Sequence, residues 1–183
     1  MMIGKMIMLD PPSFKAFLEK PKSKLISQLI VFGLGLAYGA AGIAANAGFI
    51  AGFEGDLLRN LIVPLIFLFF GLLSAWITKI GLTVLLWAGA RGFGGPGRMA
   101  AVHRAASVAL IPGILALPLL TGMAVNALTI VTMLIGVAWM YLICVRIHET
   151  TQGFAGWKAY AAVLAAFVFF ASIYYLVMPT GAL

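Results

Sequence analysis

Five long apolar segments, joined by short polar or glycine-rich connections, dominate the pattern of hydrophobic and polar positions along the chain. They cover residues 25–47, 61–90, 105–120, 126–145 and 157–178. About 20 apolar residues in a helix cross a hydrocarbon core about 30 Å thick, so the pattern predicts an all-α integral membrane bundle of five transmembrane helices. The third segment is short and contains Pro112 and Pro118, each of which removes a helical hydrogen bond, so we expect a kink there.

The chain divides into an N-terminal segment of residues 1–24 and a membrane domain of residues 25–183. The N-terminal segment is predicted to form a short amphipathic helix in the headgroup plane, which Asp10 can cap, Pro11 can begin and Pro21 ends. One face of this helix holds the predicted membrane anchors Phe14, Phe17 and Leu18. The other face carries Lys15, Glu19 and Lys20. The alternative is a flexible basic tail that only fixes the topology.

The composition places most of the chain in lipid. Of the 183 residues, 63% are hydrophobic and 9% are charged, whereas about a quarter of the residues of a soluble domain are charged. A water-soluble globule is therefore excluded. The only cysteine, Cys144, cannot form an internal disulfide, so the fold depends on packing.

The basic residues are sorted to alternate connections between the apolar segments. Ten of the 12 Lys and Arg residues lie in residues 1–24, in the second connection or around the fourth. The opposite side has Arg59, and Lys79 lies within a predicted span. Because cytoplasmic loops are enriched in Lys and Arg, five spans with this pattern predict a cytoplasmic N-terminus and a C-terminus outside.

The charge also bears on the partners. A net charge of +7 in a soluble protein would suggest nucleic acid, but basic residues between apolar runs favour phospholipid headgroups. The predicted contacts with lipid or with a partner protein are Lys15, Lys20, Lys22, Lys24, Arg91, Arg98 and Arg104. Trp87 and Trp157 are predicted to be further interfacial anchors.

The first apolar segment has an alternative interpretation as a cleaved signal peptide. Lysines precede it, and small residues fill positions 39–48. Its apolar run is longer than the usual 7 to 15 residues, which favours a retained span.

Small residues in the first span indicate close helix packing. Gly35 and Gly39 are four residues apart, a spacing that lets another helix approach closely. The sequence leaves open whether that helix belongs to the same chain or to a second copy, and we favour the same chain.

Lys79 has two interpretations in the long second span. At 1.5 Å per residue it lies about 27 Å from Leu61, so in an upright helix its ammonium group reaches the cytoplasmic boundary by snorkelling. In a tilted or deeper helix it becomes a buried charge that marks a polar cavity, with Ser74 and Thr83 as candidate neighbours. This second interpretation supports an alternative function, a channel or carrier subunit for a small solute.

The chain offers little chemistry for catalysis, cofactors or metal binding. The predicted spans contain no Asp or Glu, which counts against proton-coupled transport. Cys144 and His148 are one helical turn apart and His103 is at the same predicted face, but they provide too few ligands for a metal site. The glycine-rich connection 91–98 lacks the Gly-Lys-Ser/Thr ending of a phosphate loop, so it is interpreted as a turn or as a headgroup contact. No enzyme activity, cofactor or metal is predicted.

Several short motifs resemble the Yip1 family of small five-span membrane proteins. They are Phe14, Phe17 and Pro21, the run Gly94-Gly95-Pro96-Gly97, the basic stretch 98–104 before Ile111-Pro112, and Thr151-Gln152-Gly153-Phe154 followed by Trp157-Lys158-Ala159. The resemblance implies a five-helix membrane domain with a cytoplasmic N-terminus. Eukaryotic members act in early secretory traffic and bind Rab GTPases and each other. The long acidic cytosolic N-terminal region of the family is missing from residues 1–24, which counts against GTPase binding here. The compact form of this chain resembles a prokaryotic member, which implies the bacterial inner membrane.

These observations together predict a non-enzymatic membrane protein. We expect it to assemble with other membrane proteins or with itself, or to organise the bilayer, through a basic cytoplasmic face and small-residue helix surfaces.

Overall fold

The computed structural model describes the backbone of residues 2–177 and the side chains of residues 2–172. Within this part of the chain all regular structure is helical and no strand is present. The elements in chain order are α1 (Met2–Ile7), α2 (Pro11–Glu19), α3 (Ser23–Ala45), α4 (Ala47–Ala51), the π-helical turn η1 (Leu58–Ile62), α5 (Val63–Gly92), α6 (Met99–Ala109), the 3-10 helix η2 (Ile111–Ala116), α7 (Leu117–Leu120), α8 (Ala127–Gln152) and α9 (Trp157–Val177).

The helices have the lengths and composition of a multi-pass membrane protein. Three are long and apolar enough to cross a membrane: α3 with 23 residues, the continuous η1–α5 helix with 35 residues, and α8 with 26 residues. A fourth candidate crossing consists of α6 followed by η2 and α7. The apolar part Trp157–Ser172 of α9 is shorter than a full span. Residue 178, the end of the predicted fifth span, lies outside the described residues. The described helices therefore provide three or four candidate crossings.

The kink predicted at the prolines of the third apolar segment is confirmed. Helix α6 ends at Ala109, a 3-10 helix follows with Pro112 in its first turn, and α7 begins with Pro118 in its first turn. The two halves are bent by 41°. Proline has no N–H to donate and its ring clashes with the carbonyl one turn earlier, so the helix cannot continue straight through these positions.

Local sequence signals fix both ends of α8. The Asn126 side chain accepts a hydrogen bond from the Thr129 amide at 3.0 Å, and the Asn126 amide donates to the Thr129 hydroxyl at 3.1 Å. This reciprocal pair satisfies amide groups that have no partner at a helix start. At the other end Gly153 has a φ of 71°, a conformation that glycine adopts without a Cβ penalty.

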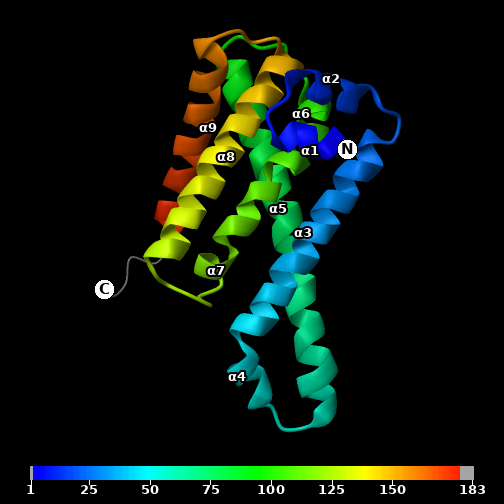
Figure 1. The fold of residues 1–183 in the computed structure, drawn as a ribbon, viewed down its shortest axis with the longest axis vertical. Helices are drawn as coiled ribbons and strands as arrows, with labels where there is room; N and C mark the ends of the chain where they lie inside the picture. The colour runs from blue at the N-terminus through cyan, green and yellow to red at the C-terminus, as the bar shows by residue number, and fades with distance from the viewer. Residues whose placement is uncertain (1, 178–183) are drawn as a thin grey trace.

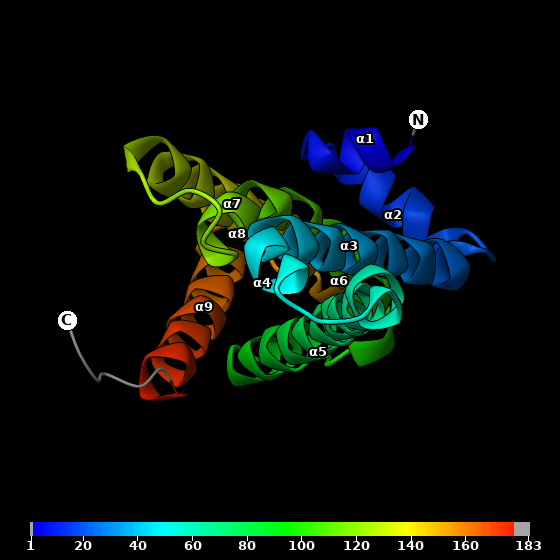
Figure 2. The same cartoon turned by 90° about the horizontal axis from the view of Figure 1, so that it is seen from below.

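Helices α3 and α5 form a tight antiparallel hairpin. Figures 1 and 2 show them side by side, and in Figure 1 the hairpin, with α4 near its tip, extends beyond the ends of α8 and α9. A Cβ atom on Gly35 would lie 2.7 Å from the Leu72 Cα, and one on Gly71 would lie 2.4 Å from the Gly39 amide nitrogen. The helix that approaches Gly35 and Gly39 is therefore α5 of the same chain.

The N-terminal segment is helical, but it packs on protein instead of lipid. The predicted helix is present as α2, with Asp10 at its N-cap position. The Asp10 carboxylate accepts a hydrogen bond from the Ser13 hydroxyl and none from a backbone amide, so the predicted side-chain cap is not formed. Its aromatic side chains Phe14 and Phe17 are 0% exposed, and the helix contacts α6 and α8. The lipid-anchor role predicted for these two residues is therefore wrong.

The physical reason lies in α6, an 11-residue helix that packs against α2. Its buried residues are mostly small, so the rings of α2 can approach closely and gain dispersion contacts that disordered lipid tails do not provide. Leu18 is half-buried against the same core. Figure 2 shows α1 and α2 on the opposite side of the molecule from α9.

One end of the molecule collects the second and fourth connections, and we call it the basic end. There α5 ends, α6 begins, α8 ends and α9 begins (Figure 1). The basic residues at or near these helix ends are Arg91, Arg98, Arg146 and Lys158. Arg59 lies instead near the tip of the α3–α5 hairpin, where it pairs with Asp56 at 2.6 Å. The sorting of charge along the sequence thus corresponds to two separate ends of the fold.

Candidate functional site

Lys79 is buried between α5 and α3. Its side chain is 1% exposed, and its ammonium nitrogen donates a hydrogen bond to the Ser27 hydroxyl at 2.9 Å. The same nitrogen lies 5.4 Å from the centre of the Trp76 ring, within the range of a cation–π interaction. The structure therefore buries the Lys79 side chain, as the second interpretation of the sequence expected, with Ser27 of α3 as its polar partner. The polar cavity of that interpretation stays a prediction.

Of the two predicted polar neighbours of Lys79, only Thr83 is close. The buried Thr83 hydroxyl donates to the Lys79 carbonyl oxygen at 2.7 Å and lies 3.4 Å from the His103 Nδ1 atom. Ser74 is exposed on α5. Thr83 thus lies between the backbone of Lys79 in α5 and a histidine of α6 that the sequence did not associate with it.

A groove lies beside this polar cluster, and we call it the α3–α6 groove. It has a volume of about 650 Å³ and is lined by Pro21, Ser23, Lys24, Met99, Ala100, His103 and Arg104. Its residues come from the start of α3 and the first half of α6, which the α2–α3 turn and the helix packing bring together. Two of the predicted contact residues, Lys24 and Arg104, therefore share one concave surface with His103.

Arg104 is held in place by backbone and side-chain partners. Its Nη1 atom donates to the Leu18 carbonyl oxygen and to the Ser23 hydroxyl, both at 3.1 Å. These bonds join α6 to the end of α2 and the start of α3. A guanidinium group has five N–H donors, so three donors, on Nη2 and Nε, remain for another partner. Arg104 therefore has a structural role in addition to its predicted surface role.

The positive charge of the α3–α6 groove is not compensated by carboxylates. Among the side chains of residues 2–172, ion pairs form only between Arg59 and Asp56 and between Arg146 and Glu149. Lys24 and Arg104 take part in neither pair. A concave surface lined by cations of one sign raises the local concentration of anions.

The glycine-rich connection is a turn held by two side chains. The Gln152 Oε1 atom accepts hydrogen bonds from the Gly97 amide at 3.0 Å and the Arg98 amide at 3.4 Å. The Trp87 indole donates to the Gly97 carbonyl oxygen at 3.2 Å, so the half-buried Trp87 ties the turn to α5. Its role as an interfacial anchor stays a prediction. Sequence reasoning gave Gln152 no role, although its motif was noted.

The remaining predicted contact residues are exposed. Lys15, Lys20 and Lys22 lie on α2 and in the turn that follows it, and Arg91 and Arg98 lie on either side of the glycine-rich turn. Trp157 is 69% exposed at the start of α9, with its ring edge-on to Phe93 at a centroid distance of 6.4 Å. These residues are free to meet lipid headgroups or a partner protein.

Cys144 and His148 are both fully buried one turn apart on α8. His148 packs on the Phe154 ring at 5.9 Å, and neither ring nitrogen has a hydrogen-bond partner among the described residues. His103 lies in the α3–α6 groove instead. Within the described residues, no group of three or more His, Cys, Asp or Glu side chains could hold a metal ion.

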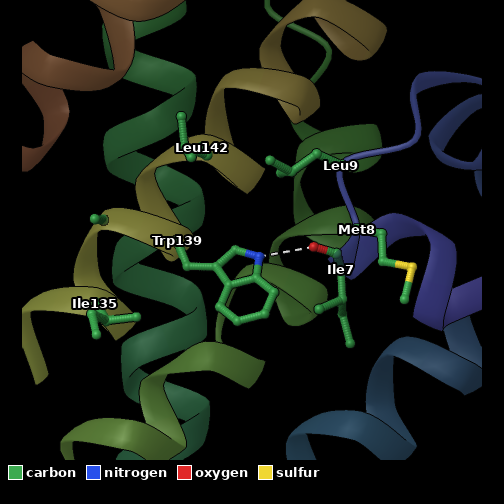
Figure 3. Close-up of a pocket in the computed structure, with 7 residues that line it drawn as sticks. Ile7, Met8, Leu9, Ile135, Trp139 and Leu142 are labelled. Carbon is green, nitrogen blue, oxygen red and sulfur yellow. Dashed lines mark hydrogen bonds between the residues drawn. The ribbon is translucent and has the colours of Figure 1, made fainter. Parts of the chain in front are cut away.

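A second, apolar groove lies between α1 and α8 (Figure 3). It has a volume of about 550 Å³ and is lined by Ile7, Met8, Leu9, Ile135, Ala138, Trp139 and Leu142. The Trp139 indole donates to the Ile7 carbonyl oxygen at 2.8 Å, as the dashed line in Figure 3 shows. This bond holds the end of α1 against the side of α8. The groove lacks the charged groups that distinguish the α3–α6 groove.

Comparison with family models, with curated proteins and with solved structures finds no match for the chain. The function is therefore argued from the geometry above.

Proposed function

We propose that the chain is a non-enzymatic, multi-pass protein of the bacterial inner membrane that binds anionic lipid headgroups and membrane partners through its basic residues. The observation that carries the proposal is the α3–α6 groove, where Lys24, His103 and Arg104 line one concave surface without a carboxylate partner in the described part of the chain. A basic residue near an anionic membrane surface contributes about 1 kcal/mol to binding. Two such groups in one groove, Lys24 and Arg104, favour an anionic headgroup over neutral ligands.

The proposed orientation places the basic end in the cytoplasm and the tip of the α3–α5 hairpin outside. It follows from the enrichment of Lys and Arg in cytoplasmic loops. With α6, η2 and α7 as one bent crossing and α9 as another, the chain has five crossings, a cytoplasmic N-terminus and a C-terminus outside.

The Yip1 resemblance fits this arrangement and belongs to the same proposal. It implies assembly with other membrane proteins or with a second copy. The exposed basic residues of α2 and of the glycine-rich turn are the surfaces proposed for such partners.

Purification from native membranes in a mild detergent tests the proposed function. The lipids and proteins that remain with the chain are identified and compared with the bulk membrane extract. We expect enrichment of anionic lipid, with or without a partner protein. A chain that purifies alone, without bound lipid or partner, would contradict the proposal.

A second candidate function, a channel or carrier subunit for a small solute, rests on Lys79. Charged side chains inside membrane proteins are costly and commonly mark a solute or ion path. The proposed path follows two neighbouring contacts. The Lys79 ammonium group bonds Ser27, and Thr83, which bonds the Lys79 carbonyl oxygen, leads to the half-buried His103. Solute flux into proteoliposomes that is unchanged by Lys79→Met would remove this candidate.

A further inference from the structure

We infer that the α3–α6 groove is a single, defined site for the phosphate of an anionic glycerophospholipid, with Lys24 and Arg104 as its two charged ligands. The inference rests on the proposed function and deepens it, because it replaces a general attraction to lipid with one site and one chemical group. It follows from the shape of the groove, the fixed position of Arg104, the electrostatics of the neighbouring groups and the apolar surface that begins beside the groove.

The size of the groove fits a headgroup. Its volume of about 650 Å³ lies in the range of ligand pockets, about 300 to 1,000 Å³. It is open on one side, so a headgroup can enter while its acyl chains stay outside. Two of its seven lining residues carry a permanent positive charge, and His103 adds a ring nitrogen that can donate when protonated.

Arg104 is preorganised for a phosphate. Both donors of Nη1 are bound to Leu18 and Ser23, which fixes the guanidinium plane relative to α2 and α3. The remaining fork of Nη2 and Nε can bind two oxygens of one phosphate at once. Because the side chain is already ordered in the protein, less conformational entropy is lost when the lipid binds.

The surrounding charges act in the same direction. The first residues of α6, Met99 and Ala100, line the groove, so the positive end of that helix dipole faces it. Lys79 adds a buried positive charge behind Thr83 and His103. Glu19, near the end of α2, forms no ion pair with Lys24 or Arg104 among the described side chains.

The position of the groove suits a lipid better than a free anion. Directly after Lys24, the first turns of α3 expose the apolar side chains of Leu25 and Leu29, which are 52% and 59% exposed. Acyl chains can cover this surface while the phosphate occupies the groove. Free phosphate would gain the charged contacts but would leave this apolar surface uncovered.

The test is native mass spectrometry of the full chain in detergent, titrated with dioleoyl phosphatidylglycerol and, separately, with dioleoyl phosphatidylcholine. We expect one tightly bound phosphatidylglycerol and weaker binding of phosphatidylcholine. Lys24→Gln should weaken phosphatidylglycerol binding about fivefold, the effect of about 1 kcal/mol per basic residue. The matched control is Lys158→Gln, which removes the same charge from an exposed position on α9 and should leave the affinity unchanged.

A second variant avoids the structural bonds of Arg104. Ala100 is exposed on the lip of the groove, so Ala100→Glu adds a carboxylate beside the two cations without removing a packing contact. We expect a loss of affinity at least as large as that of Lys24→Gln. Unchanged affinity in both groove variants would overturn the inference.

Three outcomes separate this inference from the proposed function. Equal weakening by Lys24→Gln and Lys158→Gln would mean diffuse attraction, which overturns the single site but leaves the proposed function standing. Equal binding of the two lipids would overturn both. Displacement of the bound lipid by millimolar inorganic phosphate would show a site for a soluble anion and would overturn the assignment to lipid.

Discussion

Lys79 is a buried lysine without a carboxylate partner among the described side chains. A charged lysine taken out of water inside a membrane protein costs about 3 kcal/mol. Its ammonium group contacts the Ser27 hydroxyl and the Trp76 ring, but no carboxylate among the described side chains neutralises the charge, so these contacts offset part of the cost. Methionine has a similar shape without the charge. Lys79→Met should therefore raise the free energy of unfolding by about 1 to 3 kcal/mol, measured by thermal or denaturant unfolding in detergent.

The control for this prediction is Lys158→Met, because Lys158 is exposed and its charge is solvated. Its stability should stay within about 0.5 kcal/mol of the natural chain. A loss of stability in Lys79→Met would mean that the contacts of the ammonium group outweigh its desolvation. A gain would show that the charge is retained at a cost, which favours a role in function.

Two residues illustrate what the sequence could and could not predict at this scale. Gly35 was recognised by its spacing to Gly39, because close helix approach needs a missing side chain, and that requirement is local to the helix. Gln152 was missed, because its role depends on two amides that are 54 and 55 residues away in the chain. No local pattern reports such a pairing.

The α3–α5 hairpin gives a prediction at the scale of elements. Gly71 faces the backbone of α3, where an added Cβ would lie 2.4 Å from the Gly39 nitrogen and 2.5 Å from the Gly35 oxygen. Backbone atoms cannot move aside as a flexible side chain can, so Gly71→Ala must separate the helices. We expect a loss of about 3 kcal/mol or more in the free energy of unfolding.

Gly81→Ala is the matched control, because it is the same substitution on the same helix. Nothing lies within 4 Å of a Cβ at Gly81. Alanine is favoured over glycine in a helix by about 1 kcal/mol, so this variant should be as stable as the natural chain or slightly more stable. Equal stability losses in the two variants would contradict the close packing.

The docking of α2 gives a second prediction for an element. Phe17 is 0% exposed in contact with the helical core, so Phe17→Ala should lower the free energy of unfolding by about 3 to 5 kcal/mol. Hydrogen exchange of the α2 amides should rise at the same time. Phe32, which is exposed on α3, provides the control, and Phe32→Ala should have a much smaller effect. A Phe17→Ala variant as stable as the natural chain would contradict the packing of α2 on the protein and would favour its predicted position at the membrane surface.

At the scale of the whole molecule, the arrangement of charge predicts the topology. Single cysteines at exposed positions report which compartment a reagent reaches, and the buried Cys144 does not compete for the label. We expect Met8→Cys and Gly92→Cys to react from the cytoplasm. Glu54→Cys, near the hairpin tip, and Ala182→Cys, outside the described residues, should react from the other side.

Gly92 is a better labelling position than Gly95. A Cβ on Gly92 meets nothing within 4 Å, whereas one on Gly95 would lie 2.9 Å from the Ala90 carbonyl oxygen. Labelling of Met8→Cys and Ala182→Cys from the same compartment would require an even number of crossings. The proposed placement of the basic residues in the cytoplasm would then be wrong.

The sequence by itself determined the apolar surroundings, the helical class, the kink at Pro112 and the separation of charge between two ends of the fold. Each depends on composition or on residues within a turn or two of each other. The tertiary structure decided the burial of Lys79, the packing of Phe14 and Phe17 on the helical core, the bonds of Arg104 to α2 and α3, and the α3–α6 groove. The reason is that lipid and protein are both apolar surroundings, so a hydrophobic pattern cannot say which of them a side chain will meet. Whether a side chain meets lipid or protein depends on partners that are distant in the sequence and come together only in the assembled helices.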